Sequence, residues 1–229
     1  MRIRVDVETD AASLRWEDVH GPARGVVYAL LGSEDADMAR SLHDNGWKGH
    51  PLKPLGLTSP QFRGARPVDG VYTTSRDGAI WFGSPVPEIA SVLVKSLASR
   101  TEIVWGSTRL KVRGFQLDFG ATPQGKLVEL ATATPVILKR ENRFLLPGEP
   151  HFMECLERNL AHKADVLGLP APRSVQLLEA GPRRRFTVRG APRHGAQVRV
   201  AMEADGRFVG ALRSWGLGLD TIQGFGWIR

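Results

Sequence analysis

The sequence has little of the chemistry on which several protein classes depend. It contains a single cysteine, Cys155, among 229 residues, so an internal disulfide and a cysteine-rich zinc site are both excluded. Its apolar runs fall short of the ~20 residues that span a bilayer, and the strand-like residues 1–7 do not resemble a secretion signal. We therefore expect a cytoplasmic protein without a membrane segment, whose 42% hydrophobic residues suffice for packed cores.

The sequence also lacks the patterns of metal and nucleotide sites. Six histidines occur, but none forms a His-x-x-x-His or His-Glu-x-x-His pair. The glycine-rich tail lacks the order of an ATP-binding P-loop, and it does not open a strand-turn-helix unit followed by an acidic residue. We expect chemistry that needs neither a metal nor a cofactor.

Positive charge is concentrated near the C-terminus. Residues 170–229 contain ten arginines, no lysine and four acids, and hold nearly all of the net charge of +7. Arginine forms bidentate contacts with phosphate and stacks on bases, so this excess predicts a polyanionic partner. A solvated basic face is the alternative. The arginines that lead toward the tail are the binding candidates: Arg183, Arg184, Arg185 and Arg189.

Two glycine triplets, Gly216-Leu-Gly218 and Gly224-Phe-Gly226, lie close to the end of the chain. Glycine loses more backbone entropy on folding than any other residue, so four of them within eleven positions indicate positive φ or a ligand against the main chain. We interpret this tail as a backbone cradle for phosphate. A tight structural connection is the alternative.

Hydrophobic periodicity and turn residues predict an α+β chain in two similar parts. In the first part we expect a strand at 1–7, helices at 22–31 and 34–46 with Ser33 capping the second, and a hairpin of 71–75 with 79–83. A helix at 86–98 and further strand material at 103–119 complete this part. In the second part we expect strand material at 126–140, a helix at 149–165 and two strands at 174–189 and 197–204. A short helix at 206–214 and a last strand at 226–229 follow. Both follow the order βαββαβ, so we predict two tandem ferredoxin-like (RRM-like) domains, at 1–122 and 123–229.

One histidine stands where a catalytic group is expected. His43 follows an amphipathic helix immediately before a loop, where a rigid element holds a side chain that still reaches solvent. Histidine can take a proton from one ribose oxygen and return one to another. Tyr28 on the preceding helix, with Lys48 and Lys53 in the following loop, completes an acid-base and cation set. The alternatives are a surface histidine, a core tyrosine and solvated lysines.

The glycine tail, the segment Thr134-Pro-Val-Ile-Leu138 and the spacing of Tyr28 and Leu42-His43-Asp44 resemble a known family. It is the CRISPR-associated endoribonucleases of the Cas-six type, in the repeat-associated mysterious protein (RAMP) superfamily. The resemblance covers the whole chain. It implies a metal-independent endoribonuclease that cuts CRISPR repeat RNA into guide RNA by attack of a ribose 2′-hydroxyl, which leaves a 2′,3′-cyclic phosphate.

The resemblance also implies roles for the candidate residues. His43 is the general acid or base, with His50 as the alternative, Tyr28 is its partner, and Lys53 or Lys48 stabilises charge. Gly216, Gly218, Gly224 and Gly226 contact RNA together with the four arginines. Residues 219–223 contain no lysine or arginine, unlike the usual family pattern, so phosphate affinity there depends on backbone amides and on arginines elsewhere.

The partners implied are CRISPR repeat RNA, other subunits of a CRISPR interference complex, and a second copy of the chain. Two other functions compete with the endoribonuclease. A non-catalytic RAMP subunit that binds guide RNA within an interference complex would share the fold, the charge and the glycine tail. A ferredoxin-like domain that binds a small metabolite or acts as a protein adaptor would leave the C-terminal arginine excess unexplained.

Overall fold

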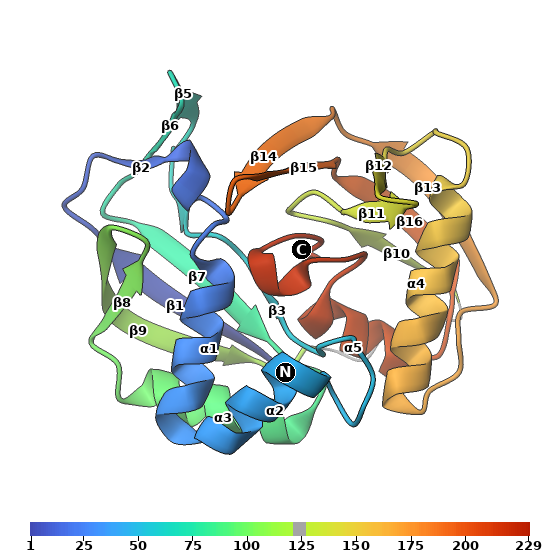
Figure 1. The fold of residues 1–229 in the computed structure, drawn as a ribbon, viewed down its shortest axis with the longest axis horizontal. Helices are drawn as coiled ribbons and strands as arrows, with labels where there is room; N and C mark the ends of the chain where they lie inside the picture. Colours follow the sequence, from blue (N-terminus) through green and yellow to red (C-terminus); the bar gives the residue numbers. More distant parts are fainter. Residues whose placement is uncertain (121–126) are drawn as a thin grey trace.

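The computed structural model describes residues 1–120 and 127–229 of the chain. These residues form two α+β halves that lie side by side, with the C-terminal tail between them (Figure 1). The predicted boundary between 122 and 123 lies outside the described residues. No helix in the described ranges is long and apolar enough to cross a membrane.

The first half is built on an antiparallel sheet in which the first strand is central. β1 pairs with β7 on one side and with β9 on the other, and the full path is β3-β7-β1-β9-β8, with β4 also on β7. This order, with one helical pair after β1 and one helix after β7, is ferredoxin-like. The elements are β1 (Arg2–Glu8), α1 (Ala23–Glu34), α2 (Ala36–Asn45), β3 (Gly56–Leu57), β4 (Gln61–Phe62), β7 (Gly78–Gly83), α3 (Pro87–Ala98), β8 (Glu102–Trp105) and β9 (Thr108–Asp118).

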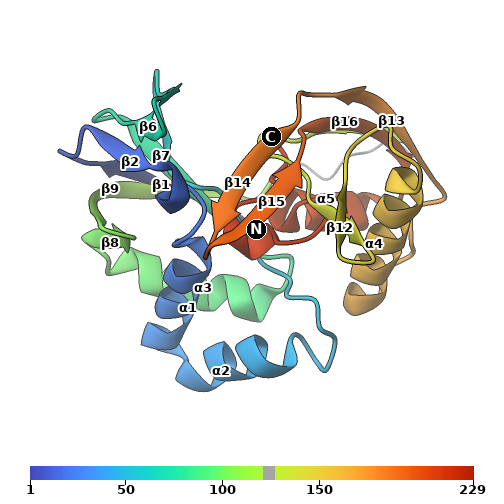
Figure 2. The ribbon, with the colours of Figure 1, turned by 45° about the horizontal axis from the view of Figure 1, so that its top comes forward.

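The helices α1 and α3 cover one face of this sheet (Figure 2). Alternate residues of β1, Ile3, Val5 and Val7, are almost fully buried, because successive strand side chains point to opposite faces. Leu31 of α1 and Leu93 of α3 belong to the same apolar cluster. The burial of these side chains fixes α1, and with it the position of the residues that α1 carries.

The second half repeats the arrangement with fewer paired residues. Its sheet has the order β10-β16-β13, and Ile228 in the tail makes an isolated bridge to Thr132 beyond β10, where a fourth strand would lie. The predicted last strand at 226–229 is thus reduced to this bridge. The elements are β10 (Leu127–Ala131), β11 (Leu138–Arg140), β12 (Arg143–Leu145), α4 (Phe152–Leu167), β13 (Ser174–Ala180), β14 (Arg184–Val188), β15 (Ala191–Gly195), β16 (Val198–Glu203) and α5 (Gly206–Trp215).

The predicted hairpin of residues 71–83 is wrong. β6 (Val71–Thr73) pairs with β2 (Ser13–Arg15) and β5 (Pro67–Val68), whereas β7 belongs to the main sheet. The Thr74 amide donates to the Ala12 carbonyl at 3.1 Å, which holds the chain on the smaller sheet before it crosses to β7. Ser75 and Asp77 bond to each other across a turn that therefore links two sheets.

The predicted cap of the second helix is displaced by two residues. Gly32 and Ser33 lie inside α1, and the Ser33 hydroxyl donates to the Leu30 carbonyl at 2.9 Å. The break comes at Asp35, whose backbone is non-helical, with φ of −149° and ψ of 89°, and whose carboxylate accepts from the Met38 amide at 2.8 Å. A side-chain oxygen that satisfies a free amide is what an N-cap provides, and Asp35 fills that role as well as serine does.

The two halves meet through the tail and an aromatic cluster. His20, after the short 3-10 helix η1 (Trp16–Asp18), stacks on Phe225 with ring centroids 4.2 Å apart and meets Phe186 edge-on at 4.5 Å. Its Nδ1 donates to the Gln223 carbonyl at 2.8 Å. His20 is buried, and burial lowers its pKa to about 4.

We predict that His20 makes the stability of the protein depend on pH. Between pH 6.5 and about 4 the unfolded chain binds a proton at His20 that the folded protein does not bind, so the free energy of unfolding falls as pH falls through this window. The loss contributed by His20 is about 3 kcal/mol. Urea unfolding at a series of pH values measures it. His20→Phe should flatten the dependence, whereas His162→Ala, at an exposed position, should leave it in place.

Candidate functional site

Three of the four predicted catalytic residues lie together beside α1. Tyr28 of α1 and His43, in the last turn of α2, meet edge to face with ring centroids 5.1 Å apart. The Lys53 ammonium donates to the main-chain carbonyl of His43 at 3.0 Å. Packing of α1 against α2 and the return of the chain after α2 therefore bring a phenol, an imidazole and an ammonium into one cluster.

Both ring nitrogens of His43 have partners. Nδ1 lies 2.8 Å from a carboxylate oxygen of Asp44, and Nε2 lies 3.0 Å from the guanidinium of Arg24. A guanidinium only donates and a carboxylate only accepts, so the neutral ring with its proton on Nδ1 satisfies both contacts. Asp44 thus orients the imidazole, and its Nε2 lone pair faces Arg24.

Arg24 is a member of the site that the sequence analysis missed. It lies one helical turn before Tyr28, and its guanidinium is also 5.8 Å from the centre of the Tyr28 ring. Residues four apart on a helix share a face, so the spacing from Tyr28 was the signal that could have identified it.

The surroundings shift the acidity of two members of the cluster. The Tyr28 hydroxyl is buried without a hydrogen-bond partner among the described residues, and burial raises the pKa of Tyr28 to about 12. Partial burial, followed by the charge of Arg24, lowers the pKa of Lys53. Tyr28 is therefore held protonated at neutral pH, while Lys53 gives up its proton more readily than a solvated lysine.

Lys48 and His50 lie apart from this cluster. The Lys48 ammonium is 5.6 Å from the centre of the Trp47 ring, and Lys48 has φ of 50° in the turn that closes between Trp47 and His50. No hydrogen bond or ring contact joins either residue to His43 in the part of the chain that the structure describes. The contacts thus favour His43 and Lys53 over His50 and Lys48, and the catalytic roles stay a prediction.

The four tail glycines are buried and all have positive φ, from 67° at Gly226 to 97° at Gly216. Each lies against the protein's own atoms. A Cβ at Gly226 would lie 1.8 Å from the Leu217 carbonyl oxygen, and one at Gly218 would lie 2.6 Å from the Ile137 carbonyl oxygen. The positive φ expected for these glycines is present, but the close approach is to main-chain atoms at Gly216, Gly218 and Gly226 and to the His20 ring at Gly224. Their contact with RNA stays a prediction.

The tail nevertheless reaches the His43 cluster across a cavity of about 280 Å³. Arg24 and Lys53 line one side, and the tail residues 218–223 line another. Thr221 closes this arrangement, because its hydroxyl donates to the Leu55 carbonyl at 2.7 Å. Residues nearly two hundred positions apart in the sequence therefore border one space between the two halves.

The four predicted arginines lie on or beside the β14–β15 hairpin, which projects at the junction of the halves (Figure 2). All four are exposed, and none forms an ion pair with a carboxylate among the described residues. Phe186 and Val188 of the same hairpin are buried, so the hairpin is anchored by apolar side chains. Its cationic groups are thus exposed to solvent, with the Arg183 guanidinium 3.1 Å from Nδ1 of His194. The four are Arg183, Arg184, Arg185 and Arg189.

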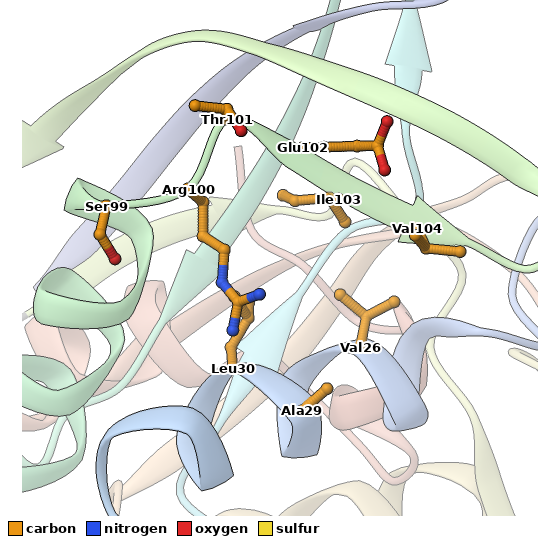
Figure 3. Close-up of a pocket in the computed structure, with 9 residues that line it drawn as sticks. All are labelled: Val26, Ala29, Leu30, Ser99, Arg100, Thr101, Glu102, Ile103 and Val104. Atoms are coloured by element: carbon orange, nitrogen blue, oxygen red, sulfur yellow. The ribbon is translucent and has the colours of Figure 1, made fainter.

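A cavity of about 460 Å³ between α1 and β8 is lined by none of the predicted residues (Figure 3). Its lining is mostly apolar, as in Val26, Leu30 and Ile103, with the Arg100 side chain across it. It contains no histidine, tyrosine or lysine. We assign it no part in the predicted chemistry.

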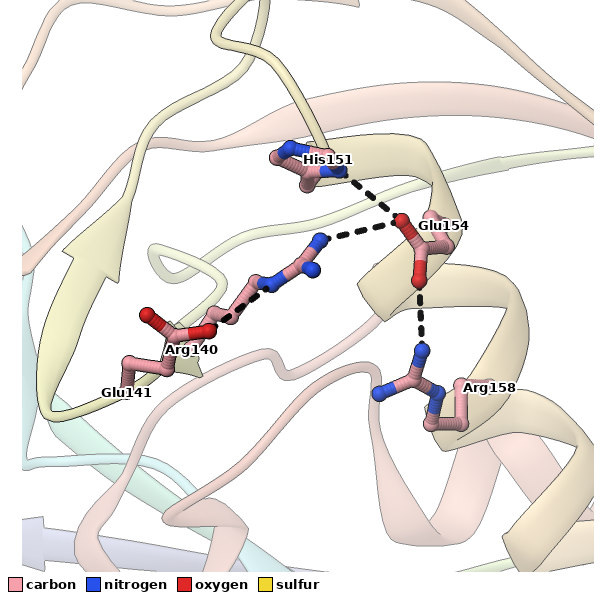
Figure 4. Close-up of polar contacts among 5 residues, drawn as sticks. All are labelled: Arg140, Glu141, His151, Glu154 and Arg158. Atoms are coloured by element: carbon pink, nitrogen blue, oxygen red, sulfur yellow. Dashed lines mark hydrogen bonds and ion pairs between the residues drawn. The ribbon is translucent and has the colours of Figure 1, made fainter.

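A second histidine cluster lies on α4. Nδ1 of His151 lies 2.9 Å from Glu154, and the same carboxylate pairs with Arg140 and Arg158 (Figure 4). The hydrogen bond from His151 and the nearby arginines lower the pKa of Glu154. This cluster lacks a tyrosine and a lysine, so of these two clusters the His43 cluster is the one that combines the groups required by the prediction. No set of three or more His, Cys, Asp or Glu side chains in the described ranges is placed to hold a metal ion.

Solved structures share this architecture over the whole chain. A Cas6-related protein from Pyrococcus furiosus superposes with a TM-score of 0.81 at 16% identity, over 100% of this chain and 97% of its own. A RAMP protein described as binding different RNA substrates gives 0.81 at 17% identity, over 100% and 98%. A CRISPR-associated protein Cas6 gives 0.78 at 19% identity, over 100% and 98%. The chain has the Cas6 fold.

Comparison of sequences does not detect the similarity to Cas6 proteins, since no family model and no curated protein matches the chain. The resemblance to the Cas6-type RAMP proteins, inferred from the glycine tail, is confirmed at the level of the fold. The prediction of two tandem ferredoxin-like domains is confirmed with it. In the Cas6 fold of this chain, the His43 cluster belongs to the first domain and the basic hairpin to the second.

The tail glycines give a prediction about stability. Gly226→Ala should lower the free energy of unfolding by about 3 kcal/mol or more, because its Cβ would overlap the Leu217 carbonyl and the backbone must move. Gly190→Ala is the matched control, with φ of 75° and nothing within 4 Å of the new Cβ, and should cost only ~1 kcal/mol of strain. Urea unfolding of both variants measures the difference. Equal losses would contradict the packing role of Gly226.

Proposed function

We propose that the protein is a metal-independent endoribonuclease that cuts CRISPR repeat RNA to produce guide RNA. The observation that carries the proposal is the cluster in which Tyr28, His43 and Lys53 meet beside an interdomain cavity. The Cas6 fold supports it, because proteins described as Cas6 product complexes share this fold over the whole chain. The exposed arginines of the β14–β15 hairpin supply a surface for the RNA backbone.

The proposed reaction is a transesterification within the RNA. The 2′-oxygen of one ribose forms a bond to the adjacent phosphorus, and the bond from that phosphorus to the 5′-oxygen of the next nucleotide breaks. The products are a 2′,3′-cyclic phosphate and a 5′-hydroxyl. The 2′-oxygen gives up one proton and the leaving 5′-oxygen gains one, so the reaction consumes no water and needs two proton-transfer groups.

The cluster supplies one group that can accept a proton and one that can donate a proton. Nε2 of His43 carries a lone pair and takes the proton of the 2′-hydroxyl once Arg24 turns from the ring to the phosphate. Tyr28 is protonated at neutral pH and donates to the 5′-oxygen, and solvent then returns the proton of His43 to Tyr28. The Lys53 ammonium stabilises the negative charge that develops on the phosphorane oxygens.

We predict that His43→Ala removes cleavage, with a rate loss of about 10²–10⁴-fold, because proton transfer contributes on this order. Affinity for repeat RNA should change by only a few-fold, since a proton-transfer group adds little ground-state binding. Single-turnover cleavage and filter binding measure the two effects. His151→Ala is the matched control, because His151 also pairs with a carboxylate at a helix end, and it should cleave as the wild type does.

The chemistry itself is tested on the wild-type protein. Cleavage should persist in excess chelator and stop when the ribose 5′ of the cut is replaced by deoxyribose, which lacks the nucleophile. Cleavage of the deoxy substrate, or loss of activity in chelator, would overturn the proposed reaction. An essential His50 with a dispensable His43 would overturn the assignment of the residue alone.

We predict that Arg184→Ala with Arg185→Ala weakens RNA binding through charge. The slope of log K against log salt should flatten by ~0.7 for each phosphate of single-stranded RNA that the variant no longer neutralises. The control replaces Arg173 and Arg207 by alanine, since both are exposed in the same half but paired with carboxylates. Affinity measured from low to high salt gives the slopes. An unchanged slope in the Arg184 and Arg185 variant would place the RNA backbone on another surface.

A non-catalytic subunit that binds guide RNA is the second candidate. It is favoured by the burial of the Tyr28 hydroxyl and by the occupation of His43 Nε2 by Arg24, which leave neither group open in this arrangement. Such a protein would bind repeat RNA with the same salt dependence and leave it uncut. The cleavage assay on wild-type protein separates the two candidates, and sedimentation with RNA tests for a homodimer or for association with other CRISPR subunits.

A further inference from the structure

The interior of the second half contains a lysine that the proposed reaction does not use. Lys163 of α4 is only 1% exposed, although the ammonium of a lysine is strongly hydrated in water. Its Nζ donates to the Gly216 carbonyl at 2.6 Å and lies 4.8 Å from the centre of the Trp215 ring. These are its polar and cation–π contacts in the described ranges, and no carboxylate pairs with it there.

Part of this arrangement stabilises the fold. Gly216 ends α5, so the Lys163 ammonium lies at the negative end of that helix dipole and satisfies one free carbonyl. One hydrogen bond uses one of the three N–H donors of an ammonium. Burial lowers the pKa of Lys163 to about 7. A capping role thus leaves two N–H donors of the ammonium without a partner among the described residues.

Lys163 lines the cavity between the two halves. The other cations on its wall are Arg24, from α1, and Lys53, from the segment after α2, so three chain segments each contribute one positive group. One carboxylate lies on the same wall, and it is neutralised: Asp220 pairs with Arg193 at 2.8 Å. The charged side chains on the cavity wall are therefore three cations and one carboxylate, and that carboxylate is paired with Arg193.

We propose that this interdomain cavity binds one phosphodiester group of the RNA strand, and that Lys163 is the residue that holds it from the second domain. An anionic oxygen accepts the free N–H donors of the ammonium and compensates its buried charge. The volume of about 280 Å³ admits a phosphodiester and part of a sugar, but it is near the lower limit of the cavities that hold larger organic ligands.

The cavity also places this phosphodiester beside the proposed reaction. Arg24 touches the His43 ring and Lys53 touches its carbonyl, and both line the cavity with Lys163. If one phosphate of an RNA strand binds Lys163, the neighbouring nucleotides of that strand therefore lie beside His43. The inference rests on RNA as the ligand of the proposed function, but it does not require that the RNA be cut.

The experiment compares Lys163→Met with Lys95→Met. Methionine keeps an unbranched stem of similar length in the core and removes the ammonium, whereas Lys95 is an exposed lysine of α3 that does not line the cavity. Binding is measured at one salt concentration with repeat RNA that carries deoxyribose 5′ of the cut, so that catalysis plays no part. We expect affinity to fall roughly tenfold or more for Lys163→Met, since a charge-assisted hydrogen bond is removed, and by less than twofold for Lys95→Met.

A second measurement uses the native protein and does not depend on how the variant folds. The ¹³Cε signal of Lys163 in labelled wild-type protein should shift on addition of repeat RNA or of inorganic phosphate, and should stay in place when chloride gives the same ionic strength. A Lys163 signal that neither anion moves would overturn the proposal. A shift with phosphate alone, together with a folded Lys163→Met protein of unchanged RNA affinity, would also overturn it.

These outcomes are separate from those of the proposed function. Weakened binding by Lys163→Met in a protein that never cuts RNA would support the anion site and reject the endoribonuclease. Normal cleavage by a folded Lys163→Met protein, with unchanged affinity for RNA, would support the endoribonuclease and reject the anion site.

Discussion

The insertion of the C-terminal tail between the two halves is the constraint on which the rest of the structure depends. The tail can lie there because its glycines adopt positive φ and have no Cβ, so that carbonyl oxygens of Leu217 and Ile137 approach their α-carbons closely. The same segment bonds to both halves, from the Thr221 hydroxyl to Leu55 in the first and from the Gly226 amide to Pro135 in the second. Glycine is required here by the protein's own packing.

This insertion also determines where a site can form. The tail lines the cavity whose other wall carries Arg24 and Lys53, so groups from α1, α4 and the end of the chain face one space. Neither half alone encloses that space. A ligand that binds in it contacts both domains at once, because Arg24 and Lys53 belong to the first half and Lys163 to the second. The exposed arginines of the β14–β15 hairpin do not line this cavity.

The sequence predicted the architecture well because periodicity is a local signal. Alternation in β1 and the helical spacing of α3 and α4 follow from burial of one face, and the ferredoxin-like order follows from them. Two of the failures depended on contacts distant in sequence: residues 71–83 divide between two sheets, and the last strand is reduced to the bridge between Ile228 and Thr132. The third was local, since Asp35 and not Ser33 caps α2. Within the site, Tyr28 and His43 were foreseeable from adjacent helices. Lys163 was not, since a lysine on an amphipathic helix predicts a solvated side chain, and only tertiary packing buries it.

The tail both packs between the two halves and lines the cavity, so a variant of the tail can change either feature. A glycine replacement there alters main-chain packing between the halves, and through Gly216 it also alters the acceptor that holds Lys163. Loss of RNA binding in such a variant would therefore follow equally from a displaced cavity wall or from a blocked phosphate contact. Side chains that line the cavity without supporting the junction separate these causes, because their replacement changes charge while the glycine turns stay in place. Lys53 meets this condition more fully than Lys163, since its hydrogen bond is to His43 within the first domain and not to the tail.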